Sequence, residues 1–224
     1  MLSDIFYPDN PKRREQLIRK GQELRDLMKN NFRATNQLND AMNKHLSCSF
    51  EHITLNESAS LRENCTLIMG CMCNIMVVVE RIDRELKEKL EPTMYEKLRK
   101  LSLSSADFKA ISKAFEAVCG IATVESTVFA GYLIDNVVTL ANITKTYAII
   151  GAGKFACVRL AVVFLGIDMI VKDIIGKIER DQLKKALEEY DKVLDEFRPA
   201  SEQYQDKITY VRVKIEMEKE DMLV

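Results

Sequence analysis

The sequence predicts an all-α protein, with long antiparallel helices in a coiled-coil-like bundle and a central apolar helical hairpin or transmembrane segment. Two observations predict this fold. Apolar residues recur at helical spacing through both ends of the chain, which are rich in charge. Between them, from about residue 111 to residue 176, the chain is apolar, poor in charge and holds most of its glycines. We therefore expect a charged N-terminal arm over 1–104, an apolar region over 105–176 and a charged C-terminal arm over 177–224.

The first helix is predicted from Pro11 to about His45. Asn10 is a plausible N-cap, because asparagine is favoured at that position and proline at the one that follows. Residues 47–57 are expected to form a loop. One heptad seam is formed by Leu17, Leu24, Met28, Leu38 and Met42, with Gly21, Asn31 and Thr35 as its weak members.

The second helix has the clearest pattern, an apolar stripe in alternating steps of four and three residues. Pro92 should end or kink this helix, because proline removes a helical N–H. Thr93–Leu101 is then a short further helix or a bent continuation, and Ser104 or Ser105 caps the next one. The stripe consists of Leu61, Cys65, Ile68, Met72, Ile75, Val79, Ile82 and Leu86.

The last helical region is predicted to begin near Asp168. Pro199 lies inside it, so a kink or break is expected near residues 197–200. Residues 211–217 alternate like a strand, but we predict helix there because the chain offers no partner strand. The seam consists of Leu183, Leu187, Tyr190, Leu194, Phe197, Ser201, Tyr204, Ile208, Val211 and Ile215.

The best candidate for a transmembrane segment is the window of residues 149–170. Eleven of its residues are Leu, Ile, Val or Phe, but Lys154, Arg159 and Asp168 interrupt it. A charge near the centre of a span costs about 2.5–3.5 kcal/mol on an insertion scale, which offsets most of the apolar gain. Basic residues follow the window, so a single span would place the C-terminus in the cytosol. A membrane hairpin of residues near 117–140 and 147–171, or a soluble helical hairpin buried by the arms, remains open.

The composition excludes some classes of function. With 33 basic and 34 acidic residues, the net charge of −1 gives no electrostatic reason to expect a nucleic-acid partner. The first residues contain no apolar core of a signal peptide. We therefore expect the six cysteines to be reduced. The sequons at Asn56, Asn64 and Asn142 matter only if their segments are luminal.

Two patterns resemble sites for chemistry, and neither has the context that such a site needs. Gly151-Ala-Gly153-Lys-Phe-Ala156 matches a dinucleotide-binding pattern, but a long helical region precedes it and no βαβ unit surrounds it. His45, Cys48 and His52, even with Cys65, match no standard zinc spacing. We therefore predict no catalytic residue, no metal site and no cofactor, and identify no small-molecule substrate.

Several short segments are together distinctive and resemble the vertebrate single-pass membrane and coiled-coil domain-containing proteins over nearly the full length. The resemblance implies helical coiled-coil regions and one membrane span in the C-terminal half, ending near residues 165–170. It implies no activity, so no catalytic residues are carried over. The charges of Lys154 and Arg159 depart from the longer uncharged stretch of that family. The matching segments are DIFYPDNPKRRE near the N-terminus, NKHLSCSF (43–50), RENCTLI (62–68), KEKLEPTMYEKL (87–98), LGIDMI (165–170) and SEQYQDKIT (201–209).

The sequence thus favours a non-enzymatic, membrane-associated coiled-coil protein that acts through helix–helix contacts. Its heptad seams would pair within the chain or with a protein partner. Two alternatives are a soluble, pore-former-like protein that later inserts a helical hairpin into a membrane, and a soluble helical scaffold in the cytoplasm.

Overall fold

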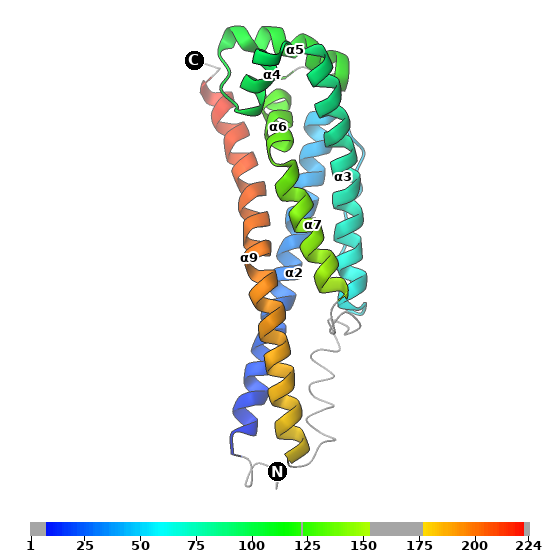
Figure 1. The fold of residues 1–224 in the computed structure, drawn as a ribbon, viewed down its shortest axis with the longest axis vertical. Coiled ribbons are helices and arrows are strands. Elements are labelled where there is room, and N and C mark those ends of the chain that lie inside the picture. Colours follow the sequence, from blue (N-terminus) through cyan, green and yellow to red (C-terminus); the bar gives the residue numbers. More distant parts are fainter. Residues whose placement is uncertain (1–7, 122, 153–176, 222–224) are drawn as a thin grey trace.

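The computed structural model describes residues 8–121, 123–152 and 177–221, and every regular element in these ranges is an α-helix. The expected all-α class is therefore confirmed. Figure 1 shows an elongated bundle in which two long helices run most of the length of the molecule. The helices are α2 (Asn10–Leu46), α3 (Leu61–Lys89), α4 (Pro92–Arg99), α5 (Ser105–Cys119), α6 (Val124–Asp135), α7 (Val137–Ala152) and α9 (Lys177–Asp221).

The two charged arms pair in parallel, which corrects the expected antiparallel arrangement. Lys20 of α2 pairs with Asp191 of α9, and further along Thr35 pairs with Tyr204, so the two sequences advance together. The reason is that α6 and α7 carry the chain back along the bundle before α9 begins (Figure 1). These two helices are antiparallel to α9, since Tyr132 lies against Tyr210 and Tyr147 lies against Phe197.

α3 also runs parallel to α2, because the chain returns along α2 as an extended loop of residues 47–60 before α3 starts. Ser60 and Glu63 form a capping box at the start of α3, and Leu90 ends the helix before Pro92. Pro92 then opens α4, as predicted. Ser104 caps α5 in a second capping box with Asp107, which decides between the two candidate serines.

The predicted seams form the core. All eight residues of the α3 stripe are buried, and so are the five apolar seam residues of α2. In α9 the seam is buried through Ile208, with Leu187 partly buried. One continuous apolar cluster joins these stripes to α6 and α7. The heptads therefore pack within the chain, where burial of each large apolar side chain contributes roughly 1.5–3 kcal/mol.

Two local expectations are corrected and a third is confirmed. Asp9, not Asn10, is the N-cap of α2, and Asn10 is already helical and buried. α9 continues through Pro199 without the break that was one expectation there, and its helix includes residues 211–217 as predicted. Phe197 and Ser201 on either side of the proline are both buried, so packing outweighs the loss of one helical hydrogen bond.

The expected apolar hairpin is only partly within the described residues. Its first arm, 117–140, is divided at Gly120, whose positive φ of 71° ends α5 in the left-handed conformation that glycine tolerates. Of the predicted membrane window 149–170, residues 149–152 end α7, and the remainder lies outside the described residues. Among the described helices, α3 instead is long and apolar enough to cross a membrane. Composition alone had favoured the later window because it lies inside the region of low charge.

Candidate functional site

The residues once considered for metal binding are dispersed in the structure. His45 is buried beside the ring of Phe129, and burial lowers the pKa of its imidazole below the ordinary value. His52 is exposed on the loop, with Nε2 2.7 Å from Oδ1 of Asp40. Across the described parts of the chain, no group of three His, Cys, Asp or Glu side chains could hold a metal ion. His45 thus packs against an aromatic ring, and His52 pairs with a carboxylate at the surface.

The first glycine of the dinucleotide-like pattern lies in a helix. Gly151 belongs to the last turn of α7, and a Cβ there would lie 3.3 Å from the Cβ of Cys65. Its carbonyl oxygen accepts a hydrogen bond of 2.9 Å from Nε of Arg62. Gly151 therefore allows α7 to approach α3 closely, whereas Gly153 lies outside the described residues.

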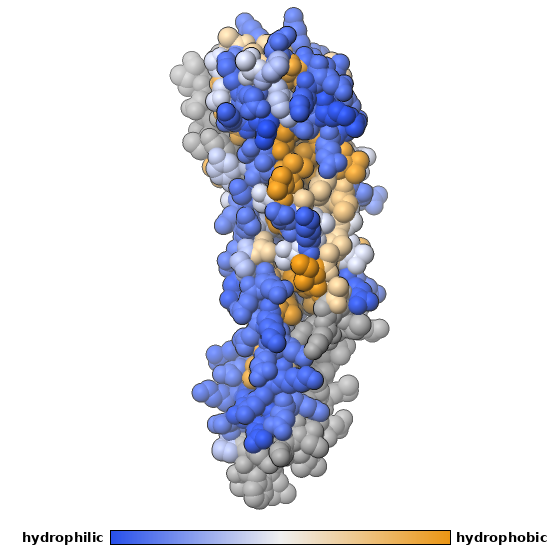
Figure 2. Space-filling view, in the orientation of Figure 1, coloured by the Kyte–Doolittle hydropathy of each residue, from blue (hydrophilic) through white to orange (hydrophobic). Residues whose placement is uncertain are grey.

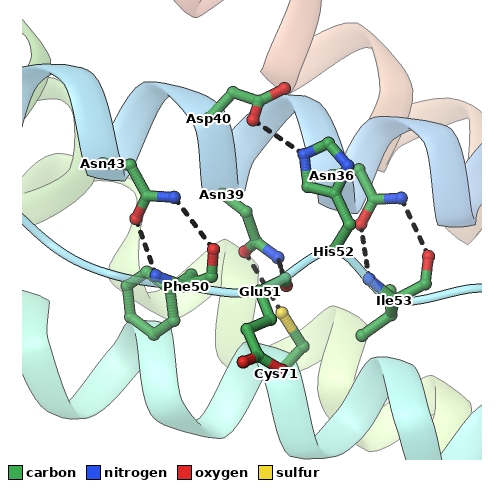
Figure 3. Close-up of polar contacts among 9 residues, drawn as sticks. All are labelled: Asn36, Asn39, Asp40, Asn43, Phe50, Glu51, His52, Ile53 and Cys71. Carbon is green, nitrogen blue, oxygen red and sulfur yellow. Dashed lines mark hydrogen bonds and ion pairs between the residues drawn. The ribbon is translucent and has the colours of Figure 1, made fainter.

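Three asparagines of α2 hold the loop that precedes α3 in an extended conformation (Figure 3). The amide of Asn43 donates to the carbonyl oxygen of Phe50 and accepts from its N–H, at 2.9 and 2.7 Å. Asn36 makes the same pair of bonds to Ile53, at 2.9 and 2.8 Å. Each amide thus replaces the hydrogen bonds that a neighbouring strand would supply to the loop backbone.

The third asparagine connects this loop to the next helix. Nδ2 of Asn39 donates to the carbonyl oxygen of Glu51, and Oδ1 of Asn39 accepts from the thiol of Cys71 on α3. We call Asn36, Asn39 and Asn43 the asparagine clamp. The heptad analysis missed it, although the spacing of three and four residues places all three on one helix face. Its effect is to fix the parallel order of α2 and α3.

A second polar cluster lies inside the pairing of α2 and α9. Oγ of Ser201 donates to Oδ1 of Asn31 at 2.9 Å, and the hydroxyls of Thr35 and Tyr204 lie 2.9 Å apart. Burial raises the pKa of Tyr204 above its ordinary value, so this phenol stays neutral. Nδ2 of Asn31 and the hydroxyl of Tyr147 are buried without a hydrogen-bond partner among the described residues. Two weak seam members of α2, Asn31 and Thr35, thus make buried polar contacts to α9.

The three sequons differ in accessibility. Asn64 is fully buried, and its amide donates to the carbonyl oxygens of Asn56 and Ser60. Asn56 is exposed on the loop, where its Oδ1 accepts from the backbone N–H and the hydroxyl of Ser58. Asn142 is exposed on α7. In the folded protein, Asn64 is therefore closed to a glycosyl donor.

The outer side of α3 and α7 is apolar, which the folding of the core does not require. Only 39% of the most apolar 18-residue window of α3 is buried. Of the large apolar side chains among the described residues, Val77, Val138 and Ile149 have the highest exposed fractions, 66%, 67% and 61%. Figure 2 shows apolar side chains gathered over this part of the molecule. We call this surface the α3–α7 face, and define it as Met69, Gly70, Cys73, Met76 and Val77 of α3 with Val138, Ala141, Lys145, Ala148 and Ile149 of α7.

The face belongs to one continuous packed unit. α3 and α7 are antiparallel neighbours, because Arg62 contacts Gly151 while Thr144 lies beside Met76. Residues 64–79 carry no charge, and residues 136–152 carry only Lys145. Charged residues resume at both ends of the α3 stretch, with Glu63 before it and Glu80 after it. The α3–α7 face is thus the strongest candidate among the described surfaces for an interaction site.

The family comparison covers most of the chain. Residues 13–173 match the model of a family described as a protein of unknown function, DUF4533. This chain belongs to that family. The matched range includes α2 through α7, and therefore both the asparagine clamp and the α3–α7 face. No solved structure matches the chain.

Proposed function

We propose that this protein is a membrane-associated helical protein without catalytic activity, which acts through helix contacts. The observation that carries the proposal is the α3–α7 face, a largely apolar surface whose single charge is Lys145, and which includes part of a helix long enough to cross a bilayer. Soluble monomers rarely expose large continuous apolar patches, because such surface is costly in water. The resemblance to single-pass membrane and coiled-coil domain-containing protein 3 supports the same function, with one span near residues 149–170.

The internal packing suggests which contacts are available to a partner. The seams of α2, α3 and α9 are buried against one another in the described bundle. A partner helix would therefore have to displace a native helix to use them. We propose that the protein associates through its outer surfaces, and that the seams maintain the bundle.

Membrane fractionation of cells that express the full chain tests this proposal. Membranes are collected, washed with high salt, and then extracted with alkaline carbonate. Retention through carbonate, with the two termini on opposite sides in a protease-protection assay, is the result expected for the span at 149–170. Release by carbonate but not by salt would support surface attachment without a span. Protein found only in the cytosol would contradict membrane association.

A further inference from the structure

We propose that the α3–α7 face lies flat against the surface of a lipid bilayer that contains anionic headgroups. This inference rests on the proposed membrane association and assigns the surface that makes the contact. An amphipathic surface of this kind buries its apolar side chains at the boundary between headgroups and acyl chains. The exposed valines and isoleucine of the face, Val77, Val138 and Ile149, would enter that boundary.

The opposite side of the bundle explains why α3 would lie along the membrane and not cross it. Cys71 is hydrogen-bonded to Asn39, and Met72 accepts a hydrogen bond from Tyr204, so these parts of α2, α3 and α9 lie at one level. At that level Asp40 on α2 and Glu202 on α9 are exposed. If α3 crossed the bilayer within this bundle, these carboxylates would enter the hydrocarbon, which is costly. Contact through one side leaves them in water.

Lys145 favours lipid over a second copy of the chain as the occupant of the face. It is exposed on α7, where the residues one turn away are the apolar Ala141, Ala148 and Ile149 and the uncharged Asn142. Neither residues 64–79 nor residues 136–152 contain an acidic side chain. A dimer that paired two such faces would enclose two lysines without a carboxylate, and an unpaired buried charge is destabilising. Against a membrane, the long side chain of Lys145 can extend to a phosphate or serine headgroup while its neighbours contact acyl chains.

The sequence that follows α7 also favours a lipid bilayer as the partner of the α3–α7 face. The described part of α7 reaches Ala152, beside the first turn of α3, where Nε of Arg62 donates to the carbonyl oxygen of Gly151. The chain then continues into most of the window 149–170, its best candidate for a transmembrane segment. A face that lies on lipid would therefore adjoin the point at which the chain enters its most membrane-compatible sequence.

Single tryptophans test the contact directly, because the chain contains none. Val77→Trp and Ile149→Trp place the probe on the face, and Tyr210→Trp places a matched probe at an exposed apolar position of α9. Each full-length variant is mixed with phosphatidylcholine–phosphatidylserine vesicles whose acyl chains are brominated near the headgroup. Bromine quenches indole emission on contact. We expect a blue shift and loss of emission at 77 and 149, and neither change at 210.

The outcomes separate this inference from the proposed function. If vesicles float with the protein and none of the three probes is quenched, membrane association stands and the assigned face is wrong. If the protein does not float with vesicles, both fail. A blue shift without quenching, together with a dimer in light scattering, would assign the face to a second copy and overturn the lipid contact.

The charge of Lys145 provides an independent test of whether the α3–α7 face contacts anionic headgroups. With Lys145 unchanged, we expect the emission change of the Val77→Trp variant to require a lower vesicle concentration as phosphatidylserine increases. Lys145→Glu should weaken that dependence, whereas Lys109→Glu, an exposed lysine of α5, should preserve it. Equal dependence in both variants would contradict the role of Lys145.

Discussion

The α2 side and the α3 side of the bundle both bury an apolar seam, but their outer surfaces differ in polarity. On the α2 side, apolar seam residues face inward, and the outside carries the asparagine clamp and charged groups such as Asp40 and Lys44. On the α3 side, the seam is equally buried, but the outside from Thr66 to Val79 is uncharged and largely apolar. Core packing explains the inner stripe of both helices and leaves the outer apolar residues of α3 unexplained. The difference indicates that these residues serve an interaction.

The largest predicted effect is the difference in stability between a substitution on the buried face of α3 and one on its exposed face. Ile75 is fully buried, so Ile75→Ala should lower the free energy of unfolding by about 2–5 kcal/mol through lost burial and a cavity. Val77 is exposed, so Val77→Ala should change it by less than about 0.5 kcal/mol. Urea denaturation of both variants measures the difference. Similar losses of stability in the two variants would show that the outer side of α3 is also packed against other residues in solution.

The asparagine clamp should be the main polar contribution on the α2 side. Asn36→Ala leaves the N–H and the carbonyl of Ile53 without these partners, which should cost about 1–3 kcal/mol. Hydrogen exchange should show faster exchange at residues 50–53 in this variant. Gln22→Ala, at an exposed position of the same helix, is the control. Unchanged exchange at the loop would show that the clamp does not hold it.

The polar cluster between α2 and α9 is predicted to contribute little net stability. Because Nδ2 of Asn31 is buried without a partner among the described residues, the double variant Asn31→Leu with Ser201→Ala should be neutral or more stable by about 1 kcal/mol. Thermal denaturation measures this. A loss of stability as large as that expected for Asn36→Ala would contradict this prediction. It would show that the cluster stabilises the fold as much as the asparagine clamp does.

The smallest effect concerns the end of the bundle at α5 and depends on pH. The ammonium of Lys97, 2.8 Å from Asp107, and hydrogen bonds from Ser104 lower the pKa of Asp107 to about 2. The folded state thus binds this proton less readily than the unfolded state, in which an aspartate has a pKa of about 3.9. The stabilisation is present above about pH 4 and is lost as the pH falls toward 2.

Asp107→Asn should therefore be less stable than the wild-type protein at pH 6, and the gap should narrow as the pH falls from 4 to 2. Urea titrations at several pH values measure the gap. Asp26→Asn, at an exposed position of α2, serves as a control without this pattern. A gap for Asp107→Asn that stays constant with pH would contradict the assigned ionic interaction.

Much of the fold could be predicted from the sequence, because helical periodicity reports directly on burial. The α3 stripe from Leu61 to Leu86 is an example, as is the cap at Ser104. The direction of the helices could not be predicted in this way. A heptad seam does not indicate helix direction, and the parallel order of α2 and α3 depends on an extended loop held by asparagine side chains of the preceding helix.

The candidate face was harder to predict for a related reason. The composition of residues 111–176 favours the later window as a membrane segment, whereas the coiled-coil spacing of α3 is typical of a buried bundle helix. The uncharged stretch from Thr66 to Val79 was visible in the sequence, but only the packing shows which of its residues remain outside the core. Apolar residues on both faces of a helix are therefore a signal that heptad analysis alone does not use.

The most direct test of the central claim compares the membrane depth of two points on the outer side of α3. Gly70 and Val77 are seven residues apart on one face, which separates them by roughly 10 Å along a helix. Gly70→Trp and Val77→Trp would be quenched in turn by lipids brominated at different acyl positions, in vesicles bound by the full-length chain. The account predicts the same shallow depth for both probes. Depths that differ by about 10 Å would mean that α3 crosses the bilayer, and no quenching at either position would remove α3 from the membrane contact.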